Sequence, residues 1–295
     1  MHTEESCHFC LSTDFRIFFF LIDKNAGYLQ CRNCGLIWLE KNHQVVADEY
    51  YKQVYNASHY GGHKNAISEF SSRLRLIEKL FTRPGLVLDI GASSGDFLNI
   101  LKSRGWQVFG VDLSEKAVEQ AKNIYSIEIF NGHISEANFP RGYFDLITLY
   151  HVLEHTDNPV SLLKEIRGFF FFEGLLVIEV PNPVGLDARL SKELLRDSIL
   201  RYPNHTYLFT PRFLKKLLER EGYEIMRMDF SFSFLLATSI RKMIFWRKQK
   251  EISSPVVFSS KVTQVKNYKN QSFLTDLLKK IFSGMNFTIV AQKSK

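Results

Sequence analysis

The segment 86–114 constrains the fold most strongly, because its pattern predicts a strand, a glycine turn, a helix and a second strand. Short apolar runs at 86–88 and 108–111 have the length of buried strands. Four residues at the ends of these runs could contact a ligand: Asp89, Gly91, Gly95 and Asp112. Glycines let a backbone approach a ligand closely, and an acid that ends the second strand can bind both hydroxyls of a ribose. The segment therefore predicts a nucleotide-type βαβ unit.

The order of residues in the turn distinguishes between two kinds of ligand. A dinucleotide fingerprint has the order G-x-G-x-x-G and places a pyrophosphate at the helix N-terminus, whereas this chain has G-A-S-S-G at 91–95. Asp89 before the turn and Asp96 after it would repel a pyrophosphate but attract a ligand with a cationic amino-acid part. Because a glycine-rich βαβ unit alone is a weak signal, an NAD site or a purely structural turn remains the alternative.

The turn and the segments after it resemble the class I S-adenosylmethionine (SAM) methyltransferases, in particular a branch with a V-L-E-H segment. The matching residues are F-D-L-I-T-L-Y-H-V-L-E-H at 144–155 and E-G-L-L-V-I-E-V-P-N-P at 173–183. This resemblance implies an α/β fold with a Rossmann-like, seven-stranded class I methyltransferase sheet. Further strands are expected at 144–149, 174–180, 223–230 and 286–292, the last antiparallel, and helices at 66–81, 160–168 and 211–221.

The same resemblance implies SAM as the cofactor and indicates which residues would hold it. Asp89 would lie near the methionine part of SAM, and Asp112 would bind its ribose. Many relatives carry an acid after the third strand to meet the adenine amine, but this chain has His133 and Ile134 there. The full set of expected SAM contacts is Asp89, Gly91, Ala92, Gly95, Asp96, Asp112, Leu113, His133, Ile134 and Tyr150.

All four cysteines lie near the start of the chain, as two C-x-x-C pairs formed by Cys7, Cys10, Cys31 and Cys34. The 20 residues between the pairs fall within the spacing of a four-thiolate zinc site. Disulfides are the poorer interpretation in a reducing cytosol. Four protein ligands leave no open position on the metal, so the pattern predicts a structural zinc in a small N-terminal zinc ribbon, with strands at 15–22 and 27–30.

Three regions are expected along the chain: a zinc ribbon at 1–40, a tyrosine-rich helical linker at 41–84, and a SAM-dependent methyltransferase domain at 85–295. The last region carries an insertion at 231–285 between its final two strands. An irregular segment at 181–210 is expected to face the substrate. Resemblance to sugar methyltransferases with a four-cysteine module makes weak donor-pocket candidates of the linker tyrosines, for which packing is the competing role: Tyr50, Tyr51, Tyr55 and Tyr60.

The chain carries a net charge of +7 with a pI near 9.1, and the excess of basic residues is concentrated at 241–270. Residues 232–248 predict an amphipathic basic helix, which would pack within the protein or at a dimer interface, or else contact an anionic membrane surface. The longest apolar runs are too short to span a bilayer, and the first residues lack the basic segment of a secretory signal. We therefore expect a cytoplasmic protein, whose oligomeric state the sequence leaves open.

Two histidines are candidates for the base that a methyl transfer often needs, because imidazole titrates near neutral pH. His205 lies in a segment, H-T-Y-L-F-T-P-R-F-L, that resembles the acceptor side of the same methyltransferase branch, and it is the first choice. His151 follows the fourth strand at the edge of the sheet where ligands bind. A metal is the alternative, because His151, Glu154 and His155 could share one helical face and form a ligand set with His205. A role in helix capping and core packing competes with it.

The leading interpretation is a SAM-dependent methyltransferase that acts on a small-molecule or sugar-type acceptor, with O-methylation favoured over C-methylation. An RNA base methyltransferase is the alternative, because a zinc ribbon and a basic pI also suit an RNA substrate. Against it, the ribbon holds few basic residues. A non-catalytic SAM-binding scaffold is a third possibility, and only measured turnover would separate it from an enzyme.

Overall fold

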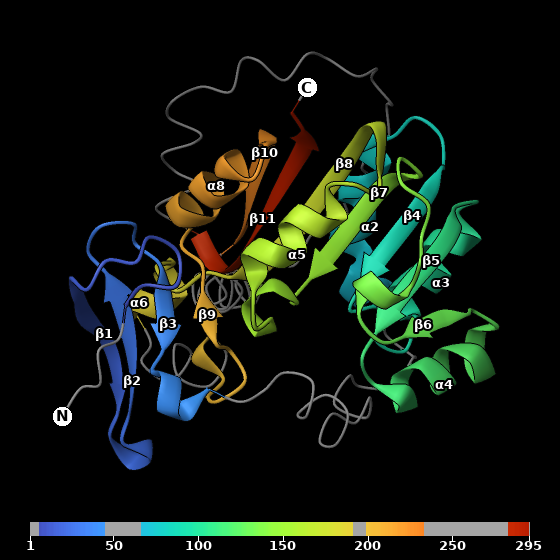
Figure 1. Cartoon of the computed structure of the whole chain (residues 1–295). Coiled ribbons are helices and arrows are strands. Elements are labelled where there is room, and N and C mark those ends of the chain that lie inside the picture. The colour runs from blue at the N-terminus through green and yellow to red at the C-terminus, as the bar shows by residue number, and fades with distance from the viewer. Residues whose placement is uncertain (1–5, 45–65, 191–198, 233–282, 295) are drawn as a thin grey trace, which may run out of the picture.

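The described chain forms two β-sheets, and the smaller one combines three N-terminal strands with a strand from far along the chain (Figure 1). The computed structural model describes residues 6–44, 66–190, 199–232 and 283–294. The large sheet has seven strands in the order β10-β11-β8-β7-β4-β5-β6, and the small sheet has the order β1-β2-β3-β9. No helix within the described ranges is both long and apolar enough to cross a membrane.

The large sheet is mostly parallel, as the sequence predicts for this fold. Its strands are β4 (Leu86–Ile90), β5 (Gln107–Asp112), β6 (Ile129–Asn131), β7 (Phe144–Tyr150), β8 (Phe170–Pro181), β10 (Tyr223–Phe232) and β11 (Ser283–Lys293). β4 pairs in parallel with both β5 and β7, and β7 pairs in parallel with β8. β11 lies between β8 and β10 and is antiparallel to both, so the expected antiparallel last strand is confirmed.

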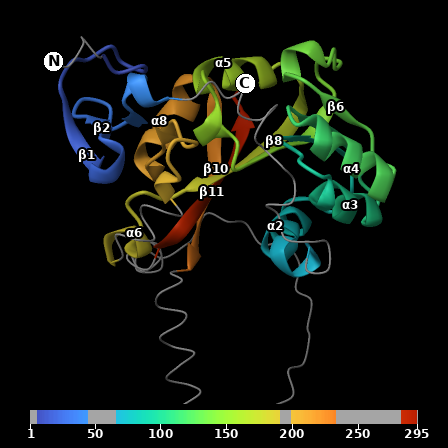
Figure 2. The ribbon, with the colours of Figure 1, turned by 90° about the horizontal axis from the view of Figure 1, so that it is seen from below.

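Helices cover both faces of this sheet, because side chains on each strand alternate between two cores. α2 (Ala66–Leu80), α3 (Asp96–Ser103) and α4 (Glu115–Tyr125) pack on one face, and α5 (Pro159–Ile166) and α8 (Pro211–Arg220) pack on the other. Figure 2 shows α2 and α5 on opposite sides of the sheet. In β4, for example, Val87 joins the core under α2 while Leu88 joins the core under α5.

The small sheet consists of β1 (Phe15–Leu21), β2 (Ala26–Cys31), β3 (Ile37–Leu39) and β9 (Tyr207–Leu208). The sequence indicates the first two strands but misses β3 and β9, and β9 comes from the far side of the methyltransferase segment. Alternation along β2 places Leu29 in the core of the large domain and Tyr28 in a separate core with Leu200. β2 and β3 are therefore buried on both faces, and the small sheet is packed against the rest of the protein.

Two segments differ from the sequence prediction. The stretch 181–210 is not wholly irregular, because it contains α6 (Leu186–Leu190) as well as β9. β8 begins at Phe170, earlier than expected, so that the last three residues of the four-phenylalanine run belong to a strand. Phe170 is buried in the core, while Phe171 and Phe172 are 55% and 71% exposed.

Short 3-10 helices complete the described structure at Ile22–Lys24 (η1), Lys41–His43 (η2), Ile134–Glu136 (η5) and Leu153–His155 (η6). Two sequence predictions lie outside the described residues. These are the linker tyrosines at 50, 51, 55 and 60, and, apart from residue 232, the basic helix at 232–248.

Candidate functional site

The candidate site lies at the carboxyl ends of β4, β5 and β7. Strand order reverses next to β4: the chain continues to β5 and β6 on one side and then returns to β7 on the other. Ligands of open α/β sheets bind at such a reversal, outside the carboxyl ends of the strands. The residues that the sequence singled out in β4, β5 and β7 therefore meet at one edge.

Glycines shape the turn between β4 and α3. Gly91 and Gly95 both have positive φ, at 74° and 75°, a backbone conformation that residues other than glycine rarely adopt. A Cβ on Gly91 would also lie 2.4 Å from Cγ2 of Val152, in the segment after β7. The turn is thus packed against the V-L-E-H segment, and this packing brings the expected donor loop and the expected acceptor residues together.

Asp112 closes β5 and anchors the turn. Its carboxylate accepts hydrogen bonds from the backbone N–H of Ser93, at 2.7 Å, and of Ser114, at 2.8 Å. Burial raises the pKa of Asp112, while the backbone donors oppose that shift. The side chain of Asn131 donates to the Asp112 carbonyl. The acid expected to hold a ribose is therefore fixed in place by the loop that it faces.

Asp89 and Asp96, the two acids that flank the turn, have different surroundings. Asp89 is 5% exposed and accepts a 2.6 Å hydrogen bond from Thr148 of β7. Burial raises the pKa of Asp89 to about 7, although the hydrogen bond from Thr148 and the charge of Arg73 lower it. Asp96 accepts hydrogen bonds from Ser94 and from the hydroxyl of Tyr125. Asp89 is consequently the acid whose charge would respond most to a bound cation.

The other residues expected to contact SAM differ in how deeply they are buried. Ala92 and Ile134 are buried, Leu113 is half-buried beside Asp112, and His133 is exposed at the start of η5. The backbone N–H of His133 donates to Glu136. These residues line the same end of β5 and β6 as Asp112, on the side of the sheet edge away from β7.

Tyr150, the last residue of β7, lies under a buried ion pair. The guanidinium of Arg73 on α2 stacks over the Tyr150 ring at 4.2 Å and is 2.8 Å from Glu179 of β8. Burial raises the pKa of Tyr150, and its hydroxyl has no hydrogen-bond partner among the described residues. A polar group buried without a partner is costly, so this hydroxyl is a candidate contact for a ligand.

His151 sits between two carboxylates. Its Nδ1 is 3.1 Å from Glu154 and its Nε2 is 3.4 Å from Glu179, and its side chain is 27% exposed. Its φ is +57°, a backbone angle that residues other than glycine rarely adopt, and His151 takes it up directly after β7. Burial lowers the pKa of His151, but the contacts with Glu154 and Glu179 outweigh it and raise the pKa to about 9. His151 is therefore protonated at neutral pH.

His205 lies on the other side of Glu154, with His155. The His155 and His205 rings contact each other edge to face at 4.6 Å, and ligand atoms of Glu154, His155 and His205 all lie within 4.8 Å of one another, close enough to hold a metal ion. Burial, and then the nearby His155, lower the pKa of His205 to about 3. His205 is thus neutral at pH 7. The structure separates it from His151, which the sequence had placed in the same possible ligand set.

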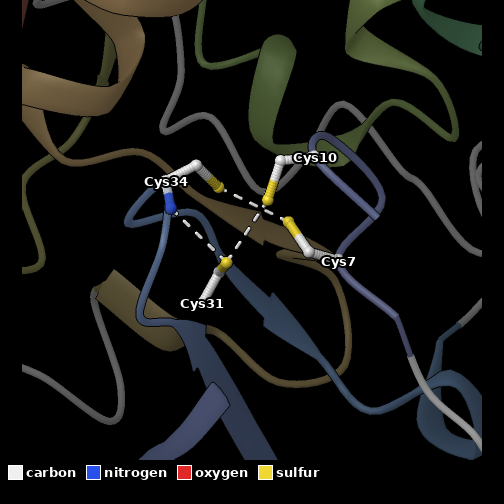
Figure 3. Close-up of side chains that lie close together, drawn as sticks. All are labelled: Cys7, Cys10, Cys31 and Cys34. Carbon is white, nitrogen blue, oxygen red and sulfur yellow. Dashed lines mark hydrogen bonds between the residues drawn. The ribbon is translucent and has the colours of Figure 1, made fainter. Parts of the chain in front are cut away.

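The four cysteines converge beside the end of β2, where Cys31 lies (Figure 3). Cys7 and Cys34 approach to 3.4 Å between sulfurs, Cys10 and Cys31 to 3.5 Å, and all four sulfurs lie within 4.8 Å of one another. A tetrahedral ion with Zn–S bonds of about 2.3 Å needs sulfurs about 3.8 Å apart. A hydrogen bond from Cys34 lowers the pKa of Cys7 to about 5, against the opposing effect of burial. The donor set and its spacing fit a metal.

Sequence reasoning missed two residues of this site, Arg73 and Glu179. Glu179 could have been noticed in the sequence, because it is a charged residue in an otherwise apolar strand, G-L-L-V-I-E-V. Arg73 carries none, because it is one of several polar residues on α2. Its role follows only from the packing of α2 over β7 and β8.

A family model described as a methyltransferase domain matches residues 63–227, more than half of the chain. The chain therefore belongs to this family of methyltransferase domains. The match covers the turn, the V-L-E-H segment and the segment that carries His205.

Curated relatives and solved structures agree with this family. Ubiquinone biosynthesis O-methyltransferases of Coxiella burnetii are 34% identical over 116 residues, which make up 37% of this chain and 50% of the relative. The corresponding protein of Nitrosomonas europaea is 30% identical over 103 residues, 30% of this chain and 43% of the relative. The chain thus spans about half the length, or less, of these relatives.

Similar folds are found in SAM-dependent methyltransferases of known structure. The protein from Archaeoglobus fulgidus has a TM-score of 0.53 at 21% identity, over 77% of this chain and 94% of its own. The protein from Aquifex aeolicus has a TM-score of 0.50 at 14% identity, over 81% and 99%. At these identities the likeness supports the fold, and it confirms the predicted Rossmann-like sheet.

Proposed function

We propose that this protein transfers the methyl group of SAM to a hydroxyl oxygen of a small-molecule or sugar-type acceptor. One observation carries the proposal: His151 and His205 lie on either side of the buried Glu154, next to the turn expected to hold SAM. The neighbouring carboxylates raise the pKa of His151, and burial lowers the pKa of His205. A hydroxyl is a weak nucleophile that must lose a proton as it attacks. The relatives named as O-methyltransferases support the same class of reaction.

In this proposal SAM supplies the methyl group on a positively charged sulfur, and the described loop holds it. Asp112 binds the ribose, while the buried Asp89 attracts the cationic amino-acid end. The positive φ of Gly91 and Gly95 brings the backbone of the turn close to the ligand. Holding donor and acceptor in line accounts for much of the rate enhancement in such a displacement.

His205 is proposed as the base and His151 as the group that orients the acceptor oxygen. His205 donates from Nδ1 to the carbonyl of Ile199 at 2.5 Å, which leaves Nε2 unprotonated and able to accept a proton. The neighbouring Glu154 stabilises the imidazolium that forms. His151, already protonated, can donate a hydrogen bond to the acceptor but cannot remove its proton.

A divalent cation at Glu154, His155 and His205 is the competing proposal for the same atoms. Oε2 of Glu154 is buried and has no hydrogen-bond partner among the described residues, which supports a bound cation at this oxygen. A bound cation would lower the pKa of a coordinated acceptor hydroxyl. A cation bound at Nε2 of His205 would prevent that nitrogen from acting as the base. Comparing the metal content of a variant lacking His155 with that of the wild type therefore separates the two roles.

We also propose a structural zinc at Cys7, Cys10, Cys31 and Cys34, supported by the sulfur spacing. Elemental analysis should find about one zinc per chain, and Cys31→Ser should abolish it. A second equivalent that survives Cys31→Ser but disappears in His155→Ala would support the cation at the histidines.

The acceptor class is tested with SAM labelled on its methyl group. The purified protein is offered panels of phenolic and sugar hydroxyl compounds and, separately, total RNA. Label transferred to a hydroxyl compound supports the proposal, and label transferred only to RNA supports the alternative of an RNA base methyltransferase. Tight SAM binding with no transfer to any panel would support a non-catalytic scaffold.

A further inference from the structure

The segment 199–208, which carries His205, is bound to the small sheet by its backbone. β9 pairs with β3 through Ile37 with Leu208 and Trp38 with Tyr207. The pairing is extended by the backbone N–H of Leu39, which donates to the carbonyl of Thr206 at 2.9 Å. The residue next to His205 is therefore hydrogen-bonded to the N-terminal region that carries the four cysteines, residues 6–40, here called the four-cysteine module.

Tyr28 of β2 makes a second connection to the same segment. Its ring is fully buried, and its hydroxyl lies 3.0 Å from the carbonyl of Leu200 and 3.0 Å from the carbonyl of His205. One hydroxyl thus ties together two points of the segment that are close in space but separated in sequence. The donor is more than 170 residues away from both acceptors.

The segment in turn fixes both buried imidazoles. Nδ1 of His205 donates to the carbonyl of Ile199, and Nδ1 of His155 lies 2.8 Å from the carbonyl of Asn204. These two carbonyls set which ring nitrogen of each histidine faces Glu154. A shift of the segment would move both rings together.

The cysteine knuckles lie at the other end of these contacts. Cys31 ends β2 and its backbone N–H donates to the carbonyl of Leu36, immediately before β3, while Gly35 donates to the carbonyl of Cys31. His8, between the first two cysteines, places Nδ1 at 2.8 Å from the hydroxyl of Tyr207 in β9. The geometry of the thiolate site therefore determines where β3 and β9 lie.

We propose that the four-cysteine module is the positioning element of the His155–His205 pair, and that Tyr28 is its principal positioning residue. The module then acts in the acceptor half of the site and leaves SAM binding unaffected. For its consequence in catalysis the inference rests on the proposed role of His205, but the positioning itself can be measured without turnover.

Tyr28→Phe tests the inference, because it removes the hydroxyl and keeps the ring. Tyr223→Phe is the matched control: Tyr223 is 1% exposed and its hydroxyl donates to a backbone carbonyl, that of Leu163, at 2.7 Å, away from the small sheet. The measurements are hydrogen exchange of peptides covering 199–210, the imidazole nitrogen shifts of His155 and His205, and SAM affinity by calorimetry.

We expect exchange in 199–210 to become about tenfold faster in Tyr28→Phe, which is the effect of leaving buried carbonyls without a donor. The nitrogen shifts of both histidines should change while SAM affinity stays within twofold. Tyr223→Phe should leave the segment and the histidines unchanged. Cys31→Ser, which removes a cysteine of the module and leaves the histidines in place, should reproduce the Tyr28→Phe changes.

Unchanged exchange and unchanged histidine shifts in Tyr28→Phe would overturn the inference, as would equal changes in Tyr223→Phe. Failure of the proposed chemistry looks different: the segment would respond to Tyr28→Phe as expected, but His205→Ala would retain full turnover on an identified acceptor.

Discussion

The proposed donor half and the proposed acceptor half of the site are built in opposite ways. The donor half, around Asp89, the glycine turn and Asp112, comes from one continuous stretch of sequence. The acceptor half gathers Arg73, His151, Glu179 and His205 from separate elements and takes support from the four-cysteine module. The difference teaches that the proposed donor site depends on local sequence, whereas the proposed acceptor site depends on long-range packing.

His205→Ala should have the largest effect, and it should impair the acceptor half without impairing the donor half. Removing the proposed base should lower kcat about 10²–10⁴-fold, because that is the usual contribution of general-base catalysis. SAM affinity should change less than twofold, since His205 lies outside the donor turn. The measurement is turnover on an acceptor together with calorimetric SAM binding, and a parallel loss of SAM affinity would contradict the separation.

Gly91→Ala should weaken SAM binding about 10–100-fold, because overpacking typically costs about 1–3 kcal/mol. The new methyl group would meet Val152 at 2.4 Å in a backbone with φ of +74°. Gly142→Ala is the control: its φ is +67°, but the nearest atom to its Cβ is 4.0 Å away. It should cost about 1–2 kcal/mol of stability from backbone strain and leave SAM affinity unchanged.

The double variant Gly91→Ala with Val152→Ala sharpens this test. Shortening Val152 removes the atom that the new Cβ would strike, so part of the lost SAM affinity should return. No recovery would mean that backbone strain alone, and not packing against the V-L-E-H segment, accounts for the loss.

The smallest expected effect concerns pH and Asp89. Its pKa of about 7 lies above the ordinary value, so without ligand its ionisation destabilises the fold: stability from this group is present at acid pH and is lost as pH rises through 7. Cationic SAM prefers the ionised carboxylate. SAM affinity should therefore rise about tenfold from pH 6 to pH 8, with proton release on binding at pH 6.

Calorimetry of SAM binding in buffers with different ionisation heats measures that proton release. Asp89→Asn should remove the pH dependence and weaken binding at pH 8. A pH dependence that survives in Asp89→Asn would assign the titration to another group.

The sequence was informative wherever function depends on neighbouring residues. Asp89, Gly91, Gly95 and Asp112 could be placed at one sheet edge because strand ends and glycine turns have local patterns. The cysteine pairs were recognisable from spacing alone, and the structure brings all four sulfurs together. The strands of the large sheet were found with shifts at their ends, most clearly in β8, whose phenylalanine run resembles no simple strand.

The sequence could not show how distant segments combine. It grouped His151 with His205, but the structure places Glu154 between them and gives the two histidines opposite protonation states. It bounded a ribbon at residue 40, but β9 completes that sheet from 207–208. Burial by a distant strand leaves no local pattern in a two-residue segment.

The sequence by itself therefore determined the class of fold, the glycine turn proposed to hold SAM and the cysteine cluster, because each depends on residue order within a few turns of chain. Tertiary structure alone decided the charges of the two histidines, the buried pair of Arg73 and Glu179, and the attachment of His205 to the cysteine module. These features arise from burial and from hydrogen bonds between residues far apart in sequence, and such contacts exist only once the chain has packed.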